Sequence, residues 1–306
     1  MALICYHPDA REVDATSDET LLQAAARAGI ALTHACGGNA RCSTCRVAIL
    51  EGLDHCTPRT DLEQGIAEHL EFKPMMRLAC QTRTTGPVTL RRLVLDYEDE
   101  SLAVESVTDP SIEAVGEERS VAILFADIRG FTSYAENLLP YDVIHTLNRY
   151  YHQIGRVIQR HHGVIDNYMG DGILAVFGLE DENDRTVSNA LQAGLEMLQE
   201  VEKLKPYFQS IHGRSFEIGI GLHYGKVVVG SVGWCANKRR TIVGDAVNFA
   251  SRVESANKTA GTNFLMSDEA YQKAGHEVEV NQCPPWEIRG KTGLYQLYEV
   301  VGSTTT

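Results

Sequence analysis

The spacing of four cysteines constrains the first third of this 306-residue chain more tightly than any other feature of its sequence. Cys36, Cys42 and Cys45 form a C-x5-C-x2-C pattern that includes two glycines, and Cys80 follows much later. A [2Fe–2S] cluster takes four thiolates, two on each iron. Three thiols from one loop and one from a distant segment fit that demand, and glycines let the backbone turn tightly and present N–H groups to the sulfurs.

A structural zinc site is the main alternative. Such a site usually carries two close Cys pairs, and only one C-x2-C is present here. His34, His55 or Cys56 could replace Cys80 as a ligand, but nothing in the sequence favours them. We therefore prefer the iron–sulfur interpretation. The remaining cysteines are interpreted as ordinary buried or surface thiols: Cys5, Cys56, Cys235 and Cys283.

Residues 1–96 as a whole resemble the [2Fe–2S] ferredoxins of β-grasp fold. The gap of five residues between the first two cysteines is that of the adrenodoxin-like branch, whereas the plant branch has four. The resemblance implies that Cys36, Cys42, Cys45 and Cys80 are the cluster ligands. It also makes an electron donor or reductase a possible partner.

Acidic residues are concentrated in the middle of the chain. The net charge is −13, and residues 97–118 contain eight acidic and no basic residues. We interpret this stretch as a solvated linker between a domain at 1–96 and a second at 119–301, with a short tail at 302–306. No nucleic acid is expected as a partner, because phosphate contacts need clustered Lys and Arg.

No apolar run in the sequence approaches the roughly 18 residues of a membrane helix. The densest, residues 121–126, has the length of a strand. The N-terminal residues lack a basic segment followed by an apolar stretch, so we expect no secretory signal and no membrane partner. We expect a cytoplasmic protein, in which eight cysteines favour metal ligation over disulfides.

Strand-like and helical segments alternate after residue 119, which predicts a sheet covered by helices and an overall α+β fold. The expected strands lie at 121–126, 163–168, 173–177, 217–223 and 227–231, and the expected helices at 141–162, 184–203 and 246–256. In the first domain, short strands are expected at 47–50 and 88–90, with a helix between a cap at Ser17 or Asp18 and a stop at Gly29.

Two aspartates lie where predicted strands end. Asp127 ends an apolar strand, and Asp171 lies in a predicted hairpin turn. Such a pair can bridge two divalent cations, because Mg²⁺ prefers oxygen ligands and keeps positions open for phosphate. Two metal ions about 3.5–4 Å apart can activate an attacking hydroxyl and neutralise a leaving group. The glycine turn at residues 130–132 offers N–H groups to a triphosphate.

Polar residues of a different kind follow downstream. Asn248 and Arg252 are four residues apart and therefore share one face of a predicted helix. Lys291 adds a cation in a strand-like context near the C-terminus. Any one of these motifs would be weak evidence, but their order and spacing together are specific.

Together the motifs resemble the catalytic domain of class III adenylyl and guanylyl cyclases, over about residues 119–301. The resemblance implies an α/β sandwich built on a ferredoxin-like palm sheet, and a head-to-tail homodimer with two composite sites. In each site one subunit holds two Mg²⁺ or Mn²⁺ ions through Asp127, Asp171 and the Ile128 carbonyl. Phe131 and Thr132 of that subunit contact the triphosphate.

The resemblance implies that the other subunit completes the site. Asn248 orients the ribose, Arg252 stabilises charge on the α-phosphate, and Lys291 binds the terminal phosphates. The reaction is then attack of the ribose 3′ oxygen on the α-phosphorus with release of pyrophosphate.

Two positions of the family pattern select the base. Adenylyl cyclases typically place Lys four residues before the second metal Asp, where this chain has Asn167. The second position is Thr241, a residue type common in bacterial adenylyl cyclases. Guanylyl cyclases usually have Glu and Cys at these positions, and neither is present. Asn167 can donate to adenine N1 or accept from guanine, so we expect ATP as substrate and keep GTP as the main alternative.

The cluster is not needed for cyclisation, so it is regulatory or structural. One hypothesis is a redox sensor that acts through residues 97–118; another is an accessory domain whose cluster holds only its own fold. A third is an electron-transfer protein with an inactive cyclase-like dimerisation module. The third is disfavoured because both metal aspartates and the Asn–Arg pair are retained.

Overall fold

The computed structural model describes residues 2–93, 116–180, 185–233, 237–275, 278–288 and 290–304. The chain divides into two compact units, Met1–Glu117 and Glu118–Thr306, which are described separately. Residues 97–115 of the predicted acidic linker, and Cys235, lie outside the described residues. Across the described ranges, no helix is both long enough and apolar enough to cross a membrane.

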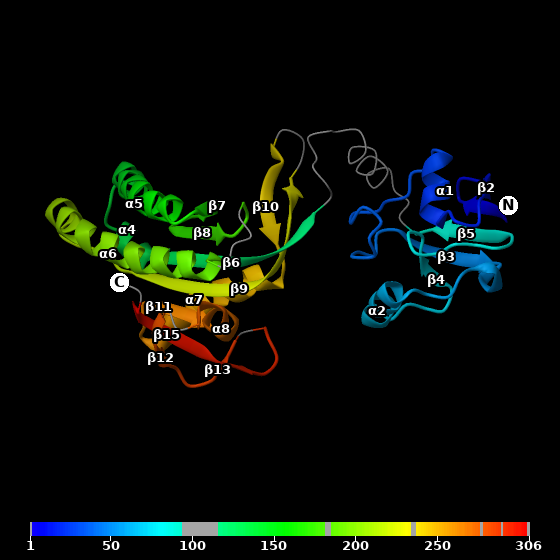
Figure 1. The fold of residues 1–306 in the computed structure, drawn as a ribbon. Coiled ribbons are helices and arrows are strands. Elements are labelled where there is room, and N and C mark those ends of the chain that lie inside the picture. Colours follow the sequence, from blue (N-terminus) through cyan, green and yellow to red (C-terminus); the bar gives the residue numbers. More distant parts are fainter. Residues whose placement is uncertain are drawn as a thin grey trace. The chain divides into compact units, whose positions relative to one another are not determined.

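The first unit is a five-stranded mixed sheet in the order β2-β1-β5-β3-β4 with helices packed against it (Figure 1). Its elements are β1 (Ala2–His7), β2 (Arg11–Ala15), α1 (Leu21–Arg27), β3 (Arg46–Glu51), η1 (Leu53–His55), α2 (Asp61–His69), β4 (Met76–Leu78) and β5 (Val88–Arg92). The first and last strands of this unit are neighbours in the sheet, because β1 pairs in parallel with β5. Its core is apolar, and the buried Tyr6 hydroxyl donates to the Leu21 carbonyl over 2.7 Å.

Helix α1 is confirmed, but its capping residue differs from the prediction. Thr20, and not Ser17 or Asp18, caps the helix. The Thr20 hydroxyl accepts from the Gln23 N–H at 3.2 Å, and the Gln23 side chain accepts from the Thr20 N–H at 2.9 Å. This reciprocal pair satisfies two backbone donors at once, which a Ser or Asp placed further upstream cannot do.

The second unit is an eight-stranded sheet in the order β12-β15-β11-β9-β6-β8-β7, with β10 paired to β9 (Figure 1). The strands are β6 (Glu117–Ile128), β7 (Gly163–Met169), β8 (Gly172–Phe177), β9 (Ile218–Val232), β10 (Arg239–Val243), β11 (Phe264–Ser267), β12 (Val278–Gln282) and β15 (Leu297–Ser303). Strands β13 (Trp286–Glu287) and β14 (Leu294–Tyr295) form a separate pair. The helices are α4 (Phe131–Ala135), α5 (Pro140–Arg160), α6 (Thr186–His212), α7 (Asp245–Ala260) and α8 (Asp268–Ala274).

Both faces of strand β6 are buried, which explains its uninterrupted apolar run. Successive side chains of a strand point to opposite faces. Leu124 accordingly joins the core formed with α5 and α6, whereas Ile123 joins the cluster that includes Ala246 and Ala250 of α7. The sheet is therefore covered by helices on both sides, and the α+β prediction is confirmed.

Two elements extend beyond their predicted ends. The strands expected at 217–223 and 227–231 are one continuous strand, β9, because its first half pairs with β11 and its second half with β10. Helix α6 continues past residue 203 through Pro206 to His212, since Leu204 and Phe208 keep an apolar face buried. Gly213 in the left-handed region ends the helix.

Candidate functional site

The four predicted cluster cysteines lie as two pairs. Cys36, Cys42 and Cys45 occupy the loop between α1 and β3, and Cys80 follows β4. The Cys45 and Cys80 sulfurs are 3.5 Å apart, and the Cys36 and Cys42 thiols share a hydrogen bond. Within the described parts of the chain, no three His, Cys, Asp or Glu side chains are placed to hold a single metal ion. A two-iron cluster instead needs two thiolates on each iron.

Donors surround these sulfurs. The Arg41 N–H donates to Cys36 Sγ over 3.4 Å, and the Gln81 amide to Cys80 Sγ over 3.7 Å. The hydrogen bond from Cys45 lowers the pKa of the Cys80 thiol to about 6 despite the opposing effect of burial. Burial acts against ionisation of Cys36 as well, yet the backbone donors and Cys42 outweigh it and lower the Cys36 pKa. The hydrogen bond to Cys80 and burial raise the pKa of Cys45, and burial raises that of Cys42, so one thiol of each pair is favoured as the thiolate that ligates iron.

Gly38 turns the backbone beside the thiols. Its φ of +84° lies in the left-handed region, and a Cβ there would come within 3.4 Å of Leu22 Cδ2 and 3.7 Å of Cys80 Cβ. The sulfur pairs, the donors and this left-handed turn fit a [2Fe–2S] cluster held by the four cysteines. Such a cluster would supply one-electron redox chemistry.

Asp127 and Asp171 are brought together where strands β6 and β7 of the second unit end. Asp127 lies near the end of β6, and Asp171 in the tight turn between β7 and β8. Burial and repulsion from Asp171, to which its carboxyl is hydrogen-bonded, raise the pKa of Asp127 to about 6. Two half-buried carboxylates with unbalanced charge, next to the Ile128 carbonyl, fit a site for divalent cations with oxygen ligands.

Sequence reasoning missed a third carboxylate near this pair. Glu254 of α7 is half-buried, and burial together with the charge of Asp127 raises its pKa to about 7. Its Oε1 lies against Gly219 of β9, where Arg129 also packs. Among the residues that the structure describes, none is a hydrogen-bond partner of the buried Nε of Arg129. No motif indicated Glu254, because its importance depends on the packing of α7 on β9.

Helix α7 and the loop after β13 bring three predicted residues into one region. Asn248 and Arg252 share a face of α7, and the Arg252 guanidinium lies 3.2 Å from where a Cβ on Gly290 would stand. Lys291 is ion-paired with Asp245 and lies 5.9 Å from the centroid of the Phe249 ring. Lys291 lies in a loop and not in the predicted strand-like context. A cavity of about 590 Å³ adjoins Gly290 and Lys291.

The two predicted base-reading residues lie close together in space, each bound to a residue that sequence reasoning missed. The Arg239 guanidinium donates to Asn167 Oδ1 over 2.9 Å. The Thr241 hydroxyl donates to Asp166 Oδ2 over 2.6 Å. These bonds join β7 to β10.

Phe131 and Thr132 begin the short helix α4. Gly130, in the left-handed region with φ +63°, turns the chain from β6 into that helix. Thr132 is exposed, whereas Phe131 is half-buried against the core and its ring stacks on Tyr134 at 6.3 Å. The turn therefore places Thr132 at the surface a few residues after Asp127.

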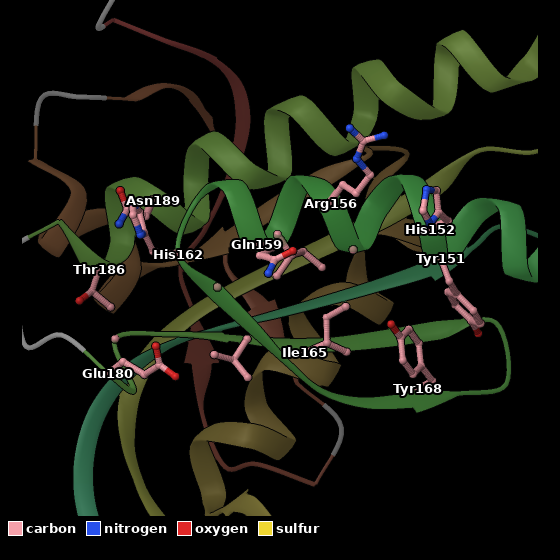
Figure 2. Close-up of a pocket in the computed structure, with 15 residues that line it drawn as sticks. Tyr151, His152, Arg156, Gln159, His162, Ile165, Tyr168, Glu180, Thr186 and Asn189 are labelled. Carbon is pink, nitrogen blue, oxygen red and sulfur yellow. The ribbon is translucent and has the colours of Figure 1, made fainter.

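A cavity of about 700 Å³ lies between α5, β7 and the start of α6 (Figure 2). The Tyr151 and Tyr168 rings meet at its edge, with centroids 4.5 Å apart, and Arg156 and Gln159 add polar groups. None of the residues predicted to act on a nucleotide lines this cavity. Its edge nevertheless adjoins the aspartate pair, because the Tyr151 hydroxyl donates to the carbonyl of Gly170, the residue before Asp171.

A helix-covered mixed sheet with an aspartate pair at its strand ends, preceded in sequence by a cysteine-loop unit, defines the class of molecule. Residues 114–301 match the family described as the adenylate and guanylate cyclase catalytic domain, and residues 6–85 match the 2Fe-2S iron-sulfur cluster binding domain. The chain belongs to the adenylate and guanylate cyclase catalytic domain family, and it carries an N-terminal domain of the 2Fe-2S type.

Curated relatives resemble the second unit. The chain is 33% identical over 196 residues to an adenylate cyclase of Anabaena cylindrica, a match covering 60% of this chain and 37% of that protein. It is 33% identical over 189 residues to the terminal-differentiation specific adenylate cyclase of Dictyostelium discoideum, covering 60% of this chain and 9% of that one. The chain thus spans well under half the length of these relatives.

Solved structures show the same fold. The guanylyl cyclase Cya2 superposes with a TM-score of 0.59 at 32% identity, over 62% of this chain and 95% of that one. The adenylyl cyclase CyaB from P. aeruginosa superposes with a TM-score of 0.58 at 26% identity, over 62% and 97%. These solved structures thus include one guanylyl cyclase and one adenylyl cyclase.

Proposed function

We propose that this protein is an adenylate cyclase that converts ATP into 3′,5′-cyclic AMP and pyrophosphate. The observation that carries the proposal is the half-buried pair of Asp127 and Asp171, in which burial and repulsion from Asp171 raise the Asp127 pKa. An arrangement of this kind is stabilised when cations bind. Two Mg²⁺ or Mn²⁺ ions held there would lower the pKa of the attacking hydroxyl and offset charge on the phosphates.

The chemistry requires one bond to form and one to break at the α-phosphorus. The ribose 3′ oxygen bonds to phosphorus, the bond from phosphorus to the bridging oxygen of the β-phosphate breaks, and the hydroxyl proton goes to water. Arg252 stabilises the charge that develops on the α-phosphate, and Asn248 holds the ribose. Lys291 exchanges its ion pair with Asp245 for the terminal phosphates.

Two copies of the chain complete each site in this proposal. Exposed apolar side chains on the β9–β10 hairpin support it: Val228, Val232 and Val243 are 42%, 52% and 53% exposed. Apolar residues on a projecting hairpin are suited to burial against a second copy. The aspartates and the α7 residues also lie on separate elements. A site shared between two copies needs such a division.

GTP is the second candidate substrate, favoured by the 32% identity to the guanylyl cyclase Cya2. Product analysis with ATP and GTP offered together tests both. We expect cyclic AMP to dominate. Predominant cyclic GMP would contradict the proposed substrate, and the absence of any cyclic nucleotide with Mg²⁺ or Mn²⁺ would contradict the proposed activity.

We further propose that the four cysteines hold a [2Fe–2S] cluster that regulates cyclisation, with an electron donor or reductase as its partner. Their pairing and the lowered pKa values of Cys36 and Cys80 support a bound cluster. Activity is to be compared in the oxidised, dithionite-reduced and cluster-free protein, with visible absorption reporting the cluster. We expect the rates to differ. Equal rates in all three states would leave the cluster a structural role only.

A further inference from the structure

A tyrosine hydroxyl from helix α5 is bonded to the turn that carries Asp171. Met169 pairs with Gly172 across the β7–β8 hairpin. The two residues between them, Gly170 and Asp171, are therefore its whole loop. The Tyr151 hydroxyl donates to the Gly170 carbonyl. That carbonyl belongs to the peptide bond between Gly170 and Asp171, and a peptide bond is planar. Holding the carbonyl therefore fixes the plane that contains the Asp171 nitrogen.

Gly170 by itself does not fix the direction of this turn. Its φ is +66°, and a Cβ built on it would meet no other atom within 4 Å. A glycine in open space has more backbone freedom than any other residue. The direction in which the loop presents the Asp171 carboxylate therefore depends on a contact from outside the loop, and the Tyr151 hydroxyl supplies one.

Tyr151 can act as an anchor because packing on helix α5 holds its ring in place. The ring lies 5.5 Å from that of Tyr150, which is fully buried in the core. The ring of Tyr168 lies 4.5 Å from it, and Figure 2 shows both side chains beside the end of the hairpin. Gly155 leaves space for this second ring, since a Cβ there would come within 4.0 Å of the Tyr168 hydroxyl.

The turn also lies against the other aspartate. A Cβ on Gly172 would stand 3.3 Å from Asp127 Oδ1, and the carboxyls of Asp127 and Asp171 share a hydrogen bond. A shift of the turn would therefore change the separation of the two carboxylates. Because Mg²⁺ demands near-ideal octahedral geometry, its binding is sensitive to such a shift.

We propose that Tyr151 is a positioning residue for the divalent-cation site. Its hydroxyl fixes the turn so that Asp171 faces Asp127 at the separation that the cations need. Tyr151 itself touches neither the nucleotide nor the metal ions. Groups that orient metal ligands in this way typically change metal affinity by about 10- to 100-fold when they are removed. This inference rests on the proposed metal site and adds to it a residue from α5.

The first test measures Mn²⁺ affinity directly, by electron paramagnetic resonance of the free ion in titrations of the full chain without nucleotide. Tyr151→Phe keeps the ring and removes only the hydroxyl, and we expect it to weaken Mn²⁺ binding about ten-fold. Tyr168→Phe is the matched control, because the Tyr168 hydroxyl makes no hydrogen bond to any residue that the structure describes. Asp127→Asn identifies which part of the signal belongs to this site.

The second test measures cyclic nucleotide formation as the Mg²⁺ concentration is varied. We expect Tyr151→Phe to raise the half-saturating Mg²⁺ concentration about ten-fold, so that added Mg²⁺ recovers much of the lost rate. A merely structural role would instead lower the maximal rate and the thermal unfolding midpoint, with an unchanged Mg²⁺ requirement. The same titration of Tyr168→Phe should follow the wild-type curve.

The binding measurement separates this inference from the proposed activity. If Tyr151→Phe weakens Mn²⁺ binding but the wild type forms no cyclic nucleotide, the proposed activity is wrong and the positioning role stands. If Asp127→Asn loses Mn²⁺ while Tyr151→Phe binds it as tightly as the wild type, the inference is wrong and the metal site stands. Equal Mn²⁺ binding by the wild type and Asp127→Asn would overturn the metal site and this inference together.

Discussion

At the scale of single residues, Glu254 makes stability depend on pH. Its pKa is raised from 4.5 to about 7 in the folded chain by burial and by Asp127. The folded state thus holds the proton more tightly than the unfolded state. The resulting stabilisation is complete below about pH 4.5 and is lost as the pH rises through about 7.

We therefore expect Glu254→Gln to stabilise the second unit at pH 8 by about 1–3 kcal/mol relative to wild type, and to change little at pH 4.5. Partial solvent exposure places the effect toward the lower end. Urea unfolding with a chelator present, followed by tryptophan fluorescence, measures it, because both tryptophans, Trp234 and Trp286, belong to this unit. The exposed Glu136→Gln is the control. If the stability difference between Glu254→Gln and wild type did not vary with pH, the pKa of Glu254 would not be raised in the folded protein.

At the scale of elements, a buried ion pair fastens α2 to β4 in the first unit. Glu63 is fully buried, and its two oxygens each lie 2.9 Å from nitrogens of Arg77. The Leu78 N–H also donates to Glu63, over 2.8 Å. Because β4 leads directly to Cys80, this contact holds the segment that carries the fourth thiol.

Removing one partner leaves a buried charge uncompensated, so we expect Glu63→Ala to destabilise the first unit by about 3–5 kcal/mol. Loss of visible cluster absorption on heating is the measurement. Glu68→Ala, at an exposed position on the same helix, should lose absorption at nearly the wild-type temperature. Equal behaviour of the two variants would mean that the ion pair does not support the cysteine segment.

At the scale of the whole molecule, the proposed dimer predicts complementation. Asp127→Asn removes a metal ligand from one half of each site, and Arg252→Ala removes a phosphate contact from the other half. Each homodimer should lose activity by roughly 100-fold or more. Mixed heterodimers should regain up to about a quarter to a half of wild-type activity, since one of two sites is intact.

The measurement is cyclic nucleotide formed after mixing and re-association of the two inactive proteins. Size-exclusion chromatography of each variant controls for a failure to dimerise. No recovery from mixed dimers of confirmed composition would rule out a site shared between two chains.

Local sequence patterns were sufficient to predict many features of this protein. The C-x5-C-x2-C spacing indicated a cysteine loop, the apolar run before Asp127 indicated a buried strand, and the four-residue spacing of Asn248 and Arg252 placed both on one helical face. Such features depend on neighbours within one or two turns, so periodicity and spacing reveal them. Helix ends were harder, because Ser17, Asp18 and Thr20 are all residue types that cap helices, and only the contact with Gln23 shows that Thr20 is the cap.

Only the tertiary structure decided which polar and charged side chains meet. Thr241 and Asp166 are 75 residues apart in sequence, and Lys291 and Asp245 are 46 apart, yet each pair is bonded. Burial of Glu254 beside Asp127 likewise depends on how α7 packs on β9. Hydrogen-bond direction and pKa shifts arise from atoms a few ångströms away in space, and a linear pattern holds no record of those distances.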